Sequence, residues 1–210
     1  MPGDRERPRP CLFGGAFDPP HRTHEQILRA ALAQLPTDRV FVVPAGRHPH
    51  KDSDLTAPAA ARLAMCRAAF AGIDGAVISE YELRRAGLSY TVDTLHYFRE
   101  HHTQGRRPFL LIGSDNLPVL HSWHRHQEVL QLAILAIYPR AGVPVTDALL
   151  RQLGLPGRQR DEALQHVLDV EPDAVSSTEV RERLRRGASC ADLLHPAVAA
   201  LIRARGLYRR

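Results

Sequence analysis

The sequence predicts an α/β fold: a doubly wound, mainly parallel β-sheet with helices on both faces and a small C-terminal helical part. Two observations support this prediction. Short apolar stretches rich in β-branched residues alternate with helical patterns along most of the chain, and such alternation is typical of right-handed strand–helix–strand crossovers. The stretches also have the length and apolar character of strands that are buried on both faces, as parallel strands are.

The elements can be placed in chain order. Strands are expected at residues 11–13, 40–43, 76–79, 109–112, 133–138 and 166–170. Helices are expected at 23–34, 58–70, 91–101, 127–132, 146–153, 178–186 and 196–205, where apolar residues recur with helical spacing or helix-start residues precede the pattern. The Gly- and Pro-bearing stretches 141–144 and 154–160 are interpreted as connections. In such sheets ligands bind outside the carboxyl ends of the strands.

Bulk composition indicates one globular domain. The chain has 210 residues, of which 44% are hydrophobic and 24% charged, so we expect a basic, disordered lead-in at 1–9 and a single domain at 10–210, with its C-terminal helical part at about 176–210. No apolar run reaches the ~20 residues of a membrane span, and no signal peptide is recognised. Cys11, Cys66 and Cys190 are scattered, which favours a reducing, cytoplasmic location. The net charge of +5 comes with dispersed arginines, so neither nucleic acid nor membrane is expected as a partner.

The most informative stretch joins the first strand to the first helix. Gly14 and Gly15 end the strand, and missing side chains there let a ligand approach the backbone closely. His21 and His24 follow at a spacing that puts both on one face of the helix start, where free N–H groups and the helix dipole favour phosphate. Neither GxxxxGK[ST] nor GxGxxG is present. Taken alone, the histidine pair also fits helix capping or metal binding.

Residues 14–24, GGAFDPPHRTH, resemble the GGxFDPxHxGH signature of the HxGH nucleotidyltransferase superfamily. Residues 176–181, SSTEVR, resemble its second signature, SSTxIR, and also read as a helix capped by Ser176 with Arg181 able to grip phosphate oxygens. The two signatures lie near opposite ends of the chain, in the superfamily's order. The resemblance implies a Rossmann-like fold and a nucleotidyl transfer reaction.

Four further segments resemble one family, the bacterial nicotinate mononucleotide adenylyltransferases. They are PHK at 49–51 with RLAM at 62–65, ELRRAGLSYTVDTL at 82–95, FLLIGSDNL at 109–117 and YPR at 138–140. The likeness implies adenylyl transfer from ATP to nicotinate mononucleotide, which gives nicotinate adenine dinucleotide and pyrophosphate in NAD biosynthesis. It also implies Mg²⁺ bound through the ATP phosphates and no protein nucleophile. A homo-oligomer is compatible with the sequence, which does not determine it.

The resemblance implies three groups of site residues. The ATP phosphates would be held and neutralised by His21, His24, Lys51 and Arg181; the rest of ATP would be bound by Gly14, Gly15, Gly113, Asp115, Ser176, Ser177 and Thr178; and the pyridine nucleotide would be received by Asp18, Tyr90, Thr91, Trp123 and Arg140. The physical properties of some of these residues agree with the roles that the resemblance implies. Trp123 suits stacking on an aromatic ring, and the N–H groups before the helix at 91–101 suit a carboxylate.

One position departs from the family pattern: Thr23 stands where the family has the glycine of HxGH. Its side chain could crowd the triphosphate, or its hydroxyl could add a donor. Two alternatives therefore stay open, an adenylyltransferase for another phosphate acceptor such as phosphopantetheine, and a non-catalytic nucleotide-binding relative. The other histidines accompany no metal-binding motif, so no metal site made by the protein is expected.

Overall fold

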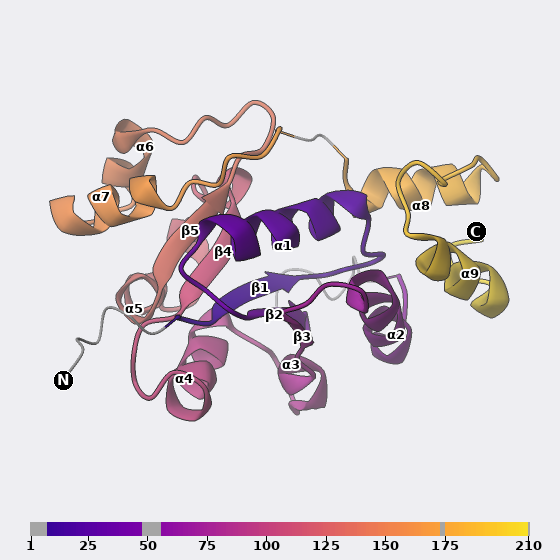
Figure 1. The fold of residues 1–210 in the computed structure, drawn as a ribbon, viewed down its shortest axis with the longest axis horizontal. Coiled ribbons are helices and arrows are strands. Elements are labelled where there is room, and N and C mark those ends of the chain that lie inside the picture. Colours follow the sequence, from indigo (N-terminus) through magenta and orange to yellow (C-terminus); the bar gives the residue numbers. More distant parts are fainter. Residues whose placement is uncertain (1–7, 48–55, 173–174, 210) are drawn as a thin grey trace.

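A five-stranded, parallel β-sheet forms the centre of the described structure (Figure 1). The structure is a computed structural model that describes residues 8–47, 56–172 and 175–209. The strand order is β3-β2-β1-β4-β5, from β1 (Cys11–Gly15), β2 (Val40–Pro44), β3 (Ala76–Ile78), β4 (Phe109–Gly113) and β5 (Ile134–Tyr138). In register, Gly15 lies beside Pro44, and Gly113 beside Tyr138. The predicted Rossmann-like, doubly wound fold is confirmed.

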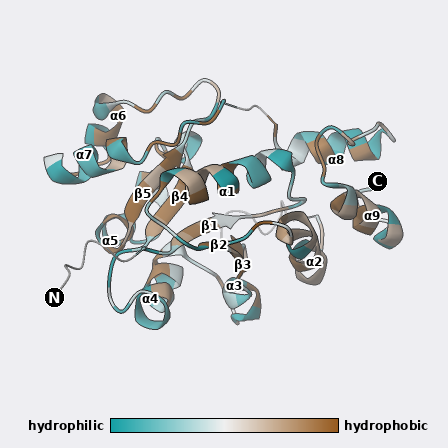
Figure 2. Cartoon of the chain, viewed as in Figure 1, coloured by the Kyte–Doolittle hydropathy of each residue, from teal (hydrophilic) through white to brown (hydrophobic). Residues whose placement is uncertain are grey.

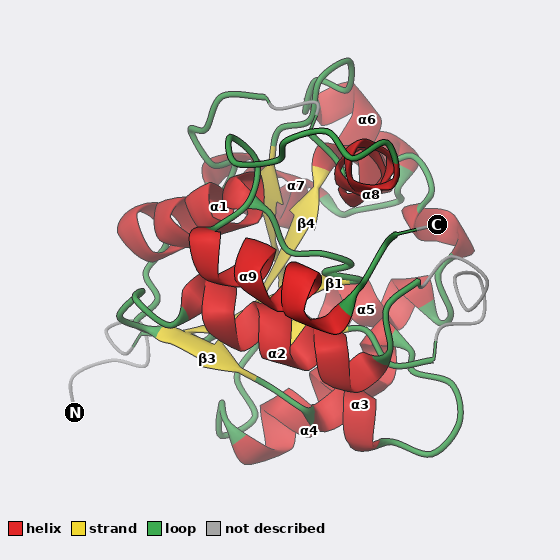
Figure 3. Cartoon of the chain, turned by 90° about the vertical axis from the view of Figure 1, so that its right-hand side faces the viewer, coloured by secondary structure: helices red, strands yellow, loops and turns green. Residues whose placement is uncertain are grey.

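Helices cover both faces of this sheet. In chain order they are α1 (Arg22–Gln34), α2 (Ala59–Phe70), α3 (Tyr81–Arg84), α4 (Thr91–His101), α5 (His126–Leu132), α6 (Asp147–Gln152), α7 (Gly157–Gln165), α8 (Ser177–Arg185) and α9 (Pro196–Arg205). The C-terminal helix α9 lies against α2, as the turned view shows (Figure 3). No helix of the described ranges is long and apolar enough to cross a membrane.

Alternate residues of each strand enter two different cores. Cys11 and Phe13 of β1 pack with buried residues of α1, α2, α8 and α9, whereas Leu12 packs with those of α4, α5 and α7. This alternation follows from the two-residue period of a strand. Because both faces are covered, the strands are mainly apolar. In Figure 2, β4 and β5 are brown, the end of β1 is paler, and the surrounding helices carry teal on their outer surfaces.

Local sequence explains the last helix well. His195 caps α9, since its Nδ1 accepts a hydrogen bond from the Ala197 N–H, and Pro196 takes the first helical position, where no N–H is needed. Gly206, at φ 61°, ends the helix in the left-handed conformation. Between these signals Val198 and Ile202 are buried on the same core as β1.

Two sequence predictions are wrong. The stretch 166–170 is not a sixth strand; it makes only an isolated bridge between Val167 and Ile137. The backbone N–H and C=O of Asp169 bond to the Gln34 side chain instead of to a strand, so the ladder stops. The second error is α7, which begins at Gly157 within the stretch interpreted as a connection. The short helix α3 also went unpredicted.

The three cysteines, Cys11, Cys66 and Cys190, are free thiols buried in the core shared by β1, α2 and the C-terminal helices. Burial raises the pKa of the Cys11 and Cys66 thiols far above the ordinary value. These thiols are therefore protonated packing groups at neutral pH.

The crevice where ligands are expected lies between β1 and β4. From β1 the chain steps outward to β2 and β3, and β4 then returns to the other side of β1. At such a reversal the connections leave in opposite directions, which opens a crevice at the carboxyl ends of the strands. The Gly-Gly turn after β1 and the turn after β4 both border this crevice.

Candidate functional site

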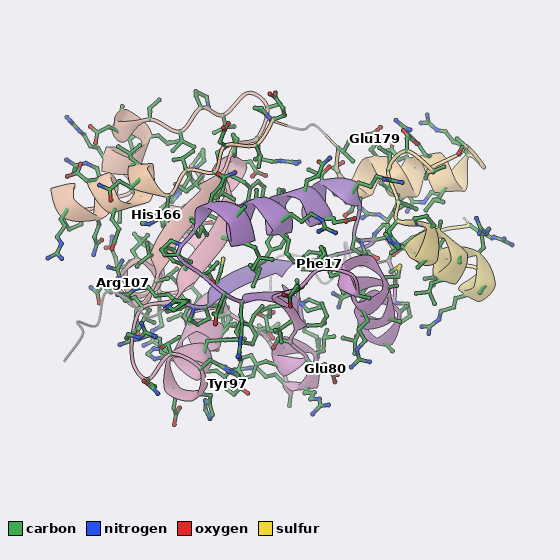
Figure 4. The ribbon with its side chains drawn as sticks, viewed as in Figure 1. Phe17, Glu80, Tyr97, Arg107, His166 and Glu179 are labelled. Atoms are coloured by element: carbon green, nitrogen blue, oxygen red, sulfur yellow. The ribbon has the colours of Figure 1, made fainter. Side chains whose placement is uncertain are left out.

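The two glycines at the end of β1 have different roles. A side chain at Gly14 would meet no atom within 4 Å, so this position faces open space at the crevice. A Cβ at Gly15 would instead lie 3.2 Å from the Phe17 ring. Phe17, which is labelled in Figure 4, is buried at φ 47°. Its ring packs on the rings of Phe13 and His24. Gly14 therefore leaves room for a ligand, and Gly15 leaves room for the turn itself.

His21 and His24 lie at the start of α1 with their ring centroids 3.8 Å apart. His24 Nδ1 accepts a 3.1 Å hydrogen bond from the backbone N–H of His21, so the neutral ring carries its proton on Nε2. Burial, with smaller effects of His21 and Arg140, lowers the pKa of His24 well below the ordinary value. In the free protein His24 is thus a neutral hydrogen-bond donor, and it adds no positive charge of its own.

Asp18, predicted to bind substrate, is enclosed by the protein. Its side chain has no exposed surface. One oxygen accepts from the Thr56 N–H at 2.6 Å, and the other accepts from the Ala57 N–H at 3.1 Å and from the Tyr208 hydroxyl at 2.6 Å. The carboxylate therefore fixes the turn after β1 to the start of the α2 region and to the residues after α9.

The two signature segments meet each other in space. Arg181 Nη1 donates to the Asp18 carbonyl at 2.9 Å, and Ser177 Oγ donates to the Pro19 carbonyl at 3.0 Å. Ser176 caps α8 as predicted, since its Oγ accepts from the Glu179 N–H. The start of α8 is thereby held against the histidine turn, which brings Arg181 and the N–H groups of this helix to the expected phosphate region.

A residue whose role the sequence did not reveal holds two strand-end loops together. Arg62 of α2 is 2% exposed and donates to the carbonyls of Ala16 and Ala45, which follow β1 and β2. Burial lowers the pKa of this guanidinium, and Asp18 is the largest influence in the opposite direction. The motif RLAM contained this residue, but only the folded chain shows which carbonyls it reaches.

A cavity of about 340 Å³ opens beside Gly14, Gly15 and Ala16. Its polar and aromatic lining includes the two predicted pyridine-binding residues Thr91 and Trp123. The remaining lining is largely apolar and comes from β1, β4 and α4, including Leu12, Leu95, Leu110 and Ile112. Such a cavity, largely apolar with a few hydroxyl groups, the Glu82 carboxyl group, the Asn116 amide and one large aromatic ring, suits a flat heteroaromatic ring. Tyr90 packs beside it, and its ring lies tilted against the His124 ring, with the ring centroids 4.3 Å apart.

A smaller pocket of about 240 Å³ lies at the end of β5. Thr23, Gln26 and Ile27 of α1 line one side, and Tyr138, Pro139, Arg140, Val170 and Glu171 line the other. Arg140, predicted to contact the pyridine nucleotide, thus lies in a different pocket from Thr91 and Trp123. Its guanidinium donates to the Val175 carbonyl at 3.3 Å. The side chain of Thr23 enters this second pocket.

The remaining predicted residues are distributed as follows. Gly113 ends β4, and a Cβ there would collide with the carboxylate of Asp115 and with the Tyr138 ring. Asp115 is exposed, and one of its oxygens accepts from Asn116 Nδ2. Thr178 accepts from Arg181 Nη2 at 3.2 Å. Lys51 lies outside the described residues.

Within the described part of the chain, no three His, Cys, Asp or Glu side chains gather as a metal site would require. The donors at the turn are imidazole, guanidinium and backbone N–H groups, which suit phosphate oxygens. A divalent ion that is carried by a triphosphate fits this donor set, because most of its ligands are phosphate and water oxygens.

The fold and the site together define a nucleotide-binding α/β protein in which a histidine turn adjoins two separate pockets. The chain belongs to the cytidylyltransferase-like family, whose model matches residues 12–183. Among its relatives is the probable nicotinate-nucleotide adenylyltransferase of Albidiferax ferrireducens, which is 39% identical over 94% of this chain and 96% of its own length. The protein of the same name from Thermotoga maritima is 36% identical over 84% and 82%.

Solved structures show the same fold. The nicotinic acid mononucleotide adenylyltransferase of Plasmodium falciparum, complexed with NaAD, superposes with a TM-score of 0.78 over 96% of this chain and 97% of its own. Its sequence identity is 19%. A putative nicotinate-nucleotide adenylyltransferase from Vibrio parahaemolyticus has a TM-score of 0.67 at 18% identity.

Proposed function

We propose that this chain transfers the adenylyl group of ATP to nicotinate mononucleotide. One observation carries the proposal: two pockets, which differ in volume and in lining residues, adjoin the same turn, and this turn carries the groups expected to bind phosphate. Gly14 and Gly15 of that turn line the larger pocket, Thr23 lines the smaller one, and His21 falls between them in sequence. A reaction that joins two nucleotides through their phosphates needs this arrangement. The names of the relatives support the choice of substrates.

The larger pocket would take the pyridine ring of nicotinate mononucleotide, against Trp123 and next to Thr91. The smaller one, beside Arg140, would take the adenosine of ATP. Asp18 is not a substrate contact in this proposal, because all its surface is buried and both its oxygens are bonded. It positions the turn that carries the histidines.

In the proposed reaction, a phosphate oxygen of nicotinate mononucleotide attacks the α-phosphorus of ATP. A P–O bond forms, the bond to the β-phosphate oxygen breaks, and pyrophosphate leaves. His24 would donate from Nε2 to a phosphate oxygen, and Arg181 would add a fixed positive charge. Mg²⁺ bound to the triphosphate would add further charge neutralisation. Catalysis would rest on positioning and electrostatics. Since the reaction draws on ATP, we place it in the cytoplasm.

The test is pyrophosphate release from ATP and Mg²⁺ with nicotinate mononucleotide, nicotinamide mononucleotide and phosphopantetheine as parallel acceptors. We expect turnover with nicotinate mononucleotide and a loss of roughly 10²–10³-fold in kcat for His24→Ala. His101→Ala, on the exposed end of α4, serves as the matched control and should leave kcat unchanged. Preference for phosphopantetheine, or ATP binding without turnover on any acceptor, would contradict the proposal.

A further inference from the structure

A third cavity, of about 500 Å³, lies away from the histidine turn. It opens between β3, α3 and the end of α4, on the face of the sheet opposite α1 (Figure 1). None of the described residues that line it lines either pocket of the proposed site. Its volume falls within the range of small-molecule sites, roughly 300–1,000 Å³. The cavity is therefore large enough for a ligand of its own.

The floor of this cavity is an apolar part of the sheet that the helices leave uncovered. Phe41 of β2 and Val77 of β3 are register partners, so their side chains project to the same face. Helix α4 covers Phe41, since the centroids of the Phe41 and Phe98 rings lie 4.9 Å apart. Val77 is on the edge strand and is 36% exposed. The four residues of α3 leave this edge open, and an apolar surface is available to a ligand.

Aromatic rings from α3 and α4 form another wall of the cavity. The Tyr81 and Tyr97 rings stack with their centroids 4.0 Å apart. The His102 ring follows, with its centroid 4.9 Å from that of Phe41. Burial is the main cause of a lowered pKa of His102, so this ring is neutral at pH 7. An apolar floor with aromatic walls suits a planar aromatic ring.

The charged groups beside this aromatic wall form a network with an excess of positive charge. Glu80 pairs with both Arg67 and Arg84. Arg85 pairs with Asp93. Three guanidinium groups thus adjoin two carboxylates, which leaves one net positive charge in this network. An anionic group on a ligand would meet complementary charge here.

The Arg85 guanidinium has a fixed orientation in this network. Its Nη1 donates to the Tyr81 hydroxyl at 2.6 Å, and its Nη2 donates to Asp93 Oδ2 at 3.1 Å. Its Cζ lies 5.5 Å from the centroid of the Tyr81 ring. A guanidinium has more N–H donors than these bonds use, and its planar fork matches the oxygens of a phosphate or carboxylate.

We propose that this cavity is a second ligand site, which takes a planar aromatic ring that carries a phosphate or carboxylate group. The ring would pack on Phe41 and Val77, and Arg84 and Arg85 would bind the anionic group. Because the described lining includes no residue of the histidine turn, a ligand in this cavity would not be a substrate of the adenylyl transfer. The inference concerns binding alone and does not rest on the proposed function.

A titration of the full chain followed by methyl NMR would locate the ligand. Val77 lines this cavity, whereas Leu12 and Leu95 line the larger pocket at the histidine turn. The probes are AMP, a ring with a phosphate, and nicotinate, a ring with a carboxylate. Adenosine, nicotinamide and inorganic phosphate each lack one of the two features. We expect AMP, nicotinate or both to shift the Val77 signals with saturation, and each control compound to bind about tenfold more weakly or worse.

Tryptophan fluorescence reports separately on the larger pocket. Trp123 is the only tryptophan of the chain and lines that pocket. A probe that also binds there would change this fluorescence with its own concentration dependence. The dissociation constant obtained from the Val77 signals therefore belongs to the third cavity.

Arg84→Ala has a matched control in Arg29→Ala. Both arginines are exposed and form ion pairs with a glutamate four residues earlier, Arg84 with Glu80 and Arg29 with Glu25. Since Arg29 lies on α1, away from this cavity, its removal should leave binding at Val77 unchanged. Arg84→Ala should weaken that binding about tenfold. The exposure of both side chains makes a loss of folding an improbable cause of any difference.

Three results would overturn the inference. They are an absence of Val77 shifts with both AMP and nicotinate, equal affinities of these probes and their uncharged counterparts, or equal affinities of the Arg84→Ala and Arg29→Ala proteins. Shifts confined to Leu12, Leu95 and Trp123 would also contradict it, because they place the probe in the larger pocket. None of these readouts depends on turnover, so failure of the proposed function is detected separately, by the absence of pyrophosphate release.

Discussion

The Tyr208 hydroxyl donates a 2.6 Å hydrogen bond to Asp18 Oδ1, which joins residues 190 positions apart in the sequence. Tyr208 is 5% exposed, and burial together with this bond raises the pKa of its hydroxyl. Asp18 Oδ1 also accepts from the Ala57 N–H. The turn that carries the histidines is thus held from both sides, by the start of the α2 region and by the residues that follow α9.

Tyr208→Phe should lower the unfolding free energy by about 1.5–3 kcal/mol, the usual range for a hydrogen bond to a charged group. It should also raise the KM for ATP, because the histidine turn loses one of its supports. Urea denaturation and steady-state kinetics measure the two effects. Tyr97→Phe, on α4 and away from this turn, is the control and should change neither. Unaltered stability of Tyr208→Phe would show that water replaces the bond at no cost.

Arg62→Met should lower the free energy of unfolding by more than Tyr208→Phe does. The change removes both donors to the Ala16 and Ala45 carbonyls and takes away one of the cations near the buried Asp18, so we expect a loss of about 3–5 kcal/mol. Arg62→Lys should recover part of this loss, because an ammonium group keeps the charge but not the planar fork. Denaturant midpoints of the three proteins test the order. Equal stability of the methionine and lysine variants would mean that the charge is unimportant.

His24 should make stability depend on pH. Its pKa is lowered in the folded state, so below about 6.5, the ordinary value, the unfolded chain binds a proton that the folded chain does not. The stabilisation that neutral His24 contributes is therefore complete above a pH of about 6.5, and it is lost as the pH falls toward the pKa that His24 has in the folded state. Melting temperatures of wild type and His24→Gln, without nucleotide, measure the difference between pH 7.5 and 5. Parallel curves for the two proteins would exclude His24 as the cause.

Thr23→Gly should lower the KM for ATP several-fold. Thr23 enters a pocket of about 240 Å³, which is below the roughly 300 Å³ at which ligand pockets usually begin. Removing the side chain should admit adenosine more easily, while the KM for nicotinate mononucleotide stays constant. Thr23→Ser tests the hydroxyl separately. A higher KM for ATP in Thr23→Gly that Thr23→Ser restores would identify the hydroxyl as a donor to ATP.

Much of the fold was predictable because local signals agree with the global structure. Continuous apolar runs give the five strands, and caps such as Ser176 and His195 mark helix starts. The errors have physical causes. At 166–170 the Gln34 side chain takes the backbone groups that a strand would use, and α7 begins at Gly157, a residue typical of loops.

The candidate site was predictable to a smaller extent. The motifs led to His21, His24 and Arg181, and the structure brings these to one turn with the start of α8. The motifs did not reveal that Arg140 and Thr91 line different pockets. They also gave no sign of the bonds made by Arg62 and Tyr208, because the partners of these side chains are set by packing between distant segments.

The buried cysteines have a practical consequence. Cys11 lies in β1 and Cys66 in α2, and burial keeps both thiols protonated. A maleimide or iodoacetamide reagent reaches these sulfurs only when the core opens, since the thiolate is the reacting species. The rate of labelling in the native protein would therefore report how often the whole core opens, and bound nucleotide would slow that rate by the amount that it stabilises the fold.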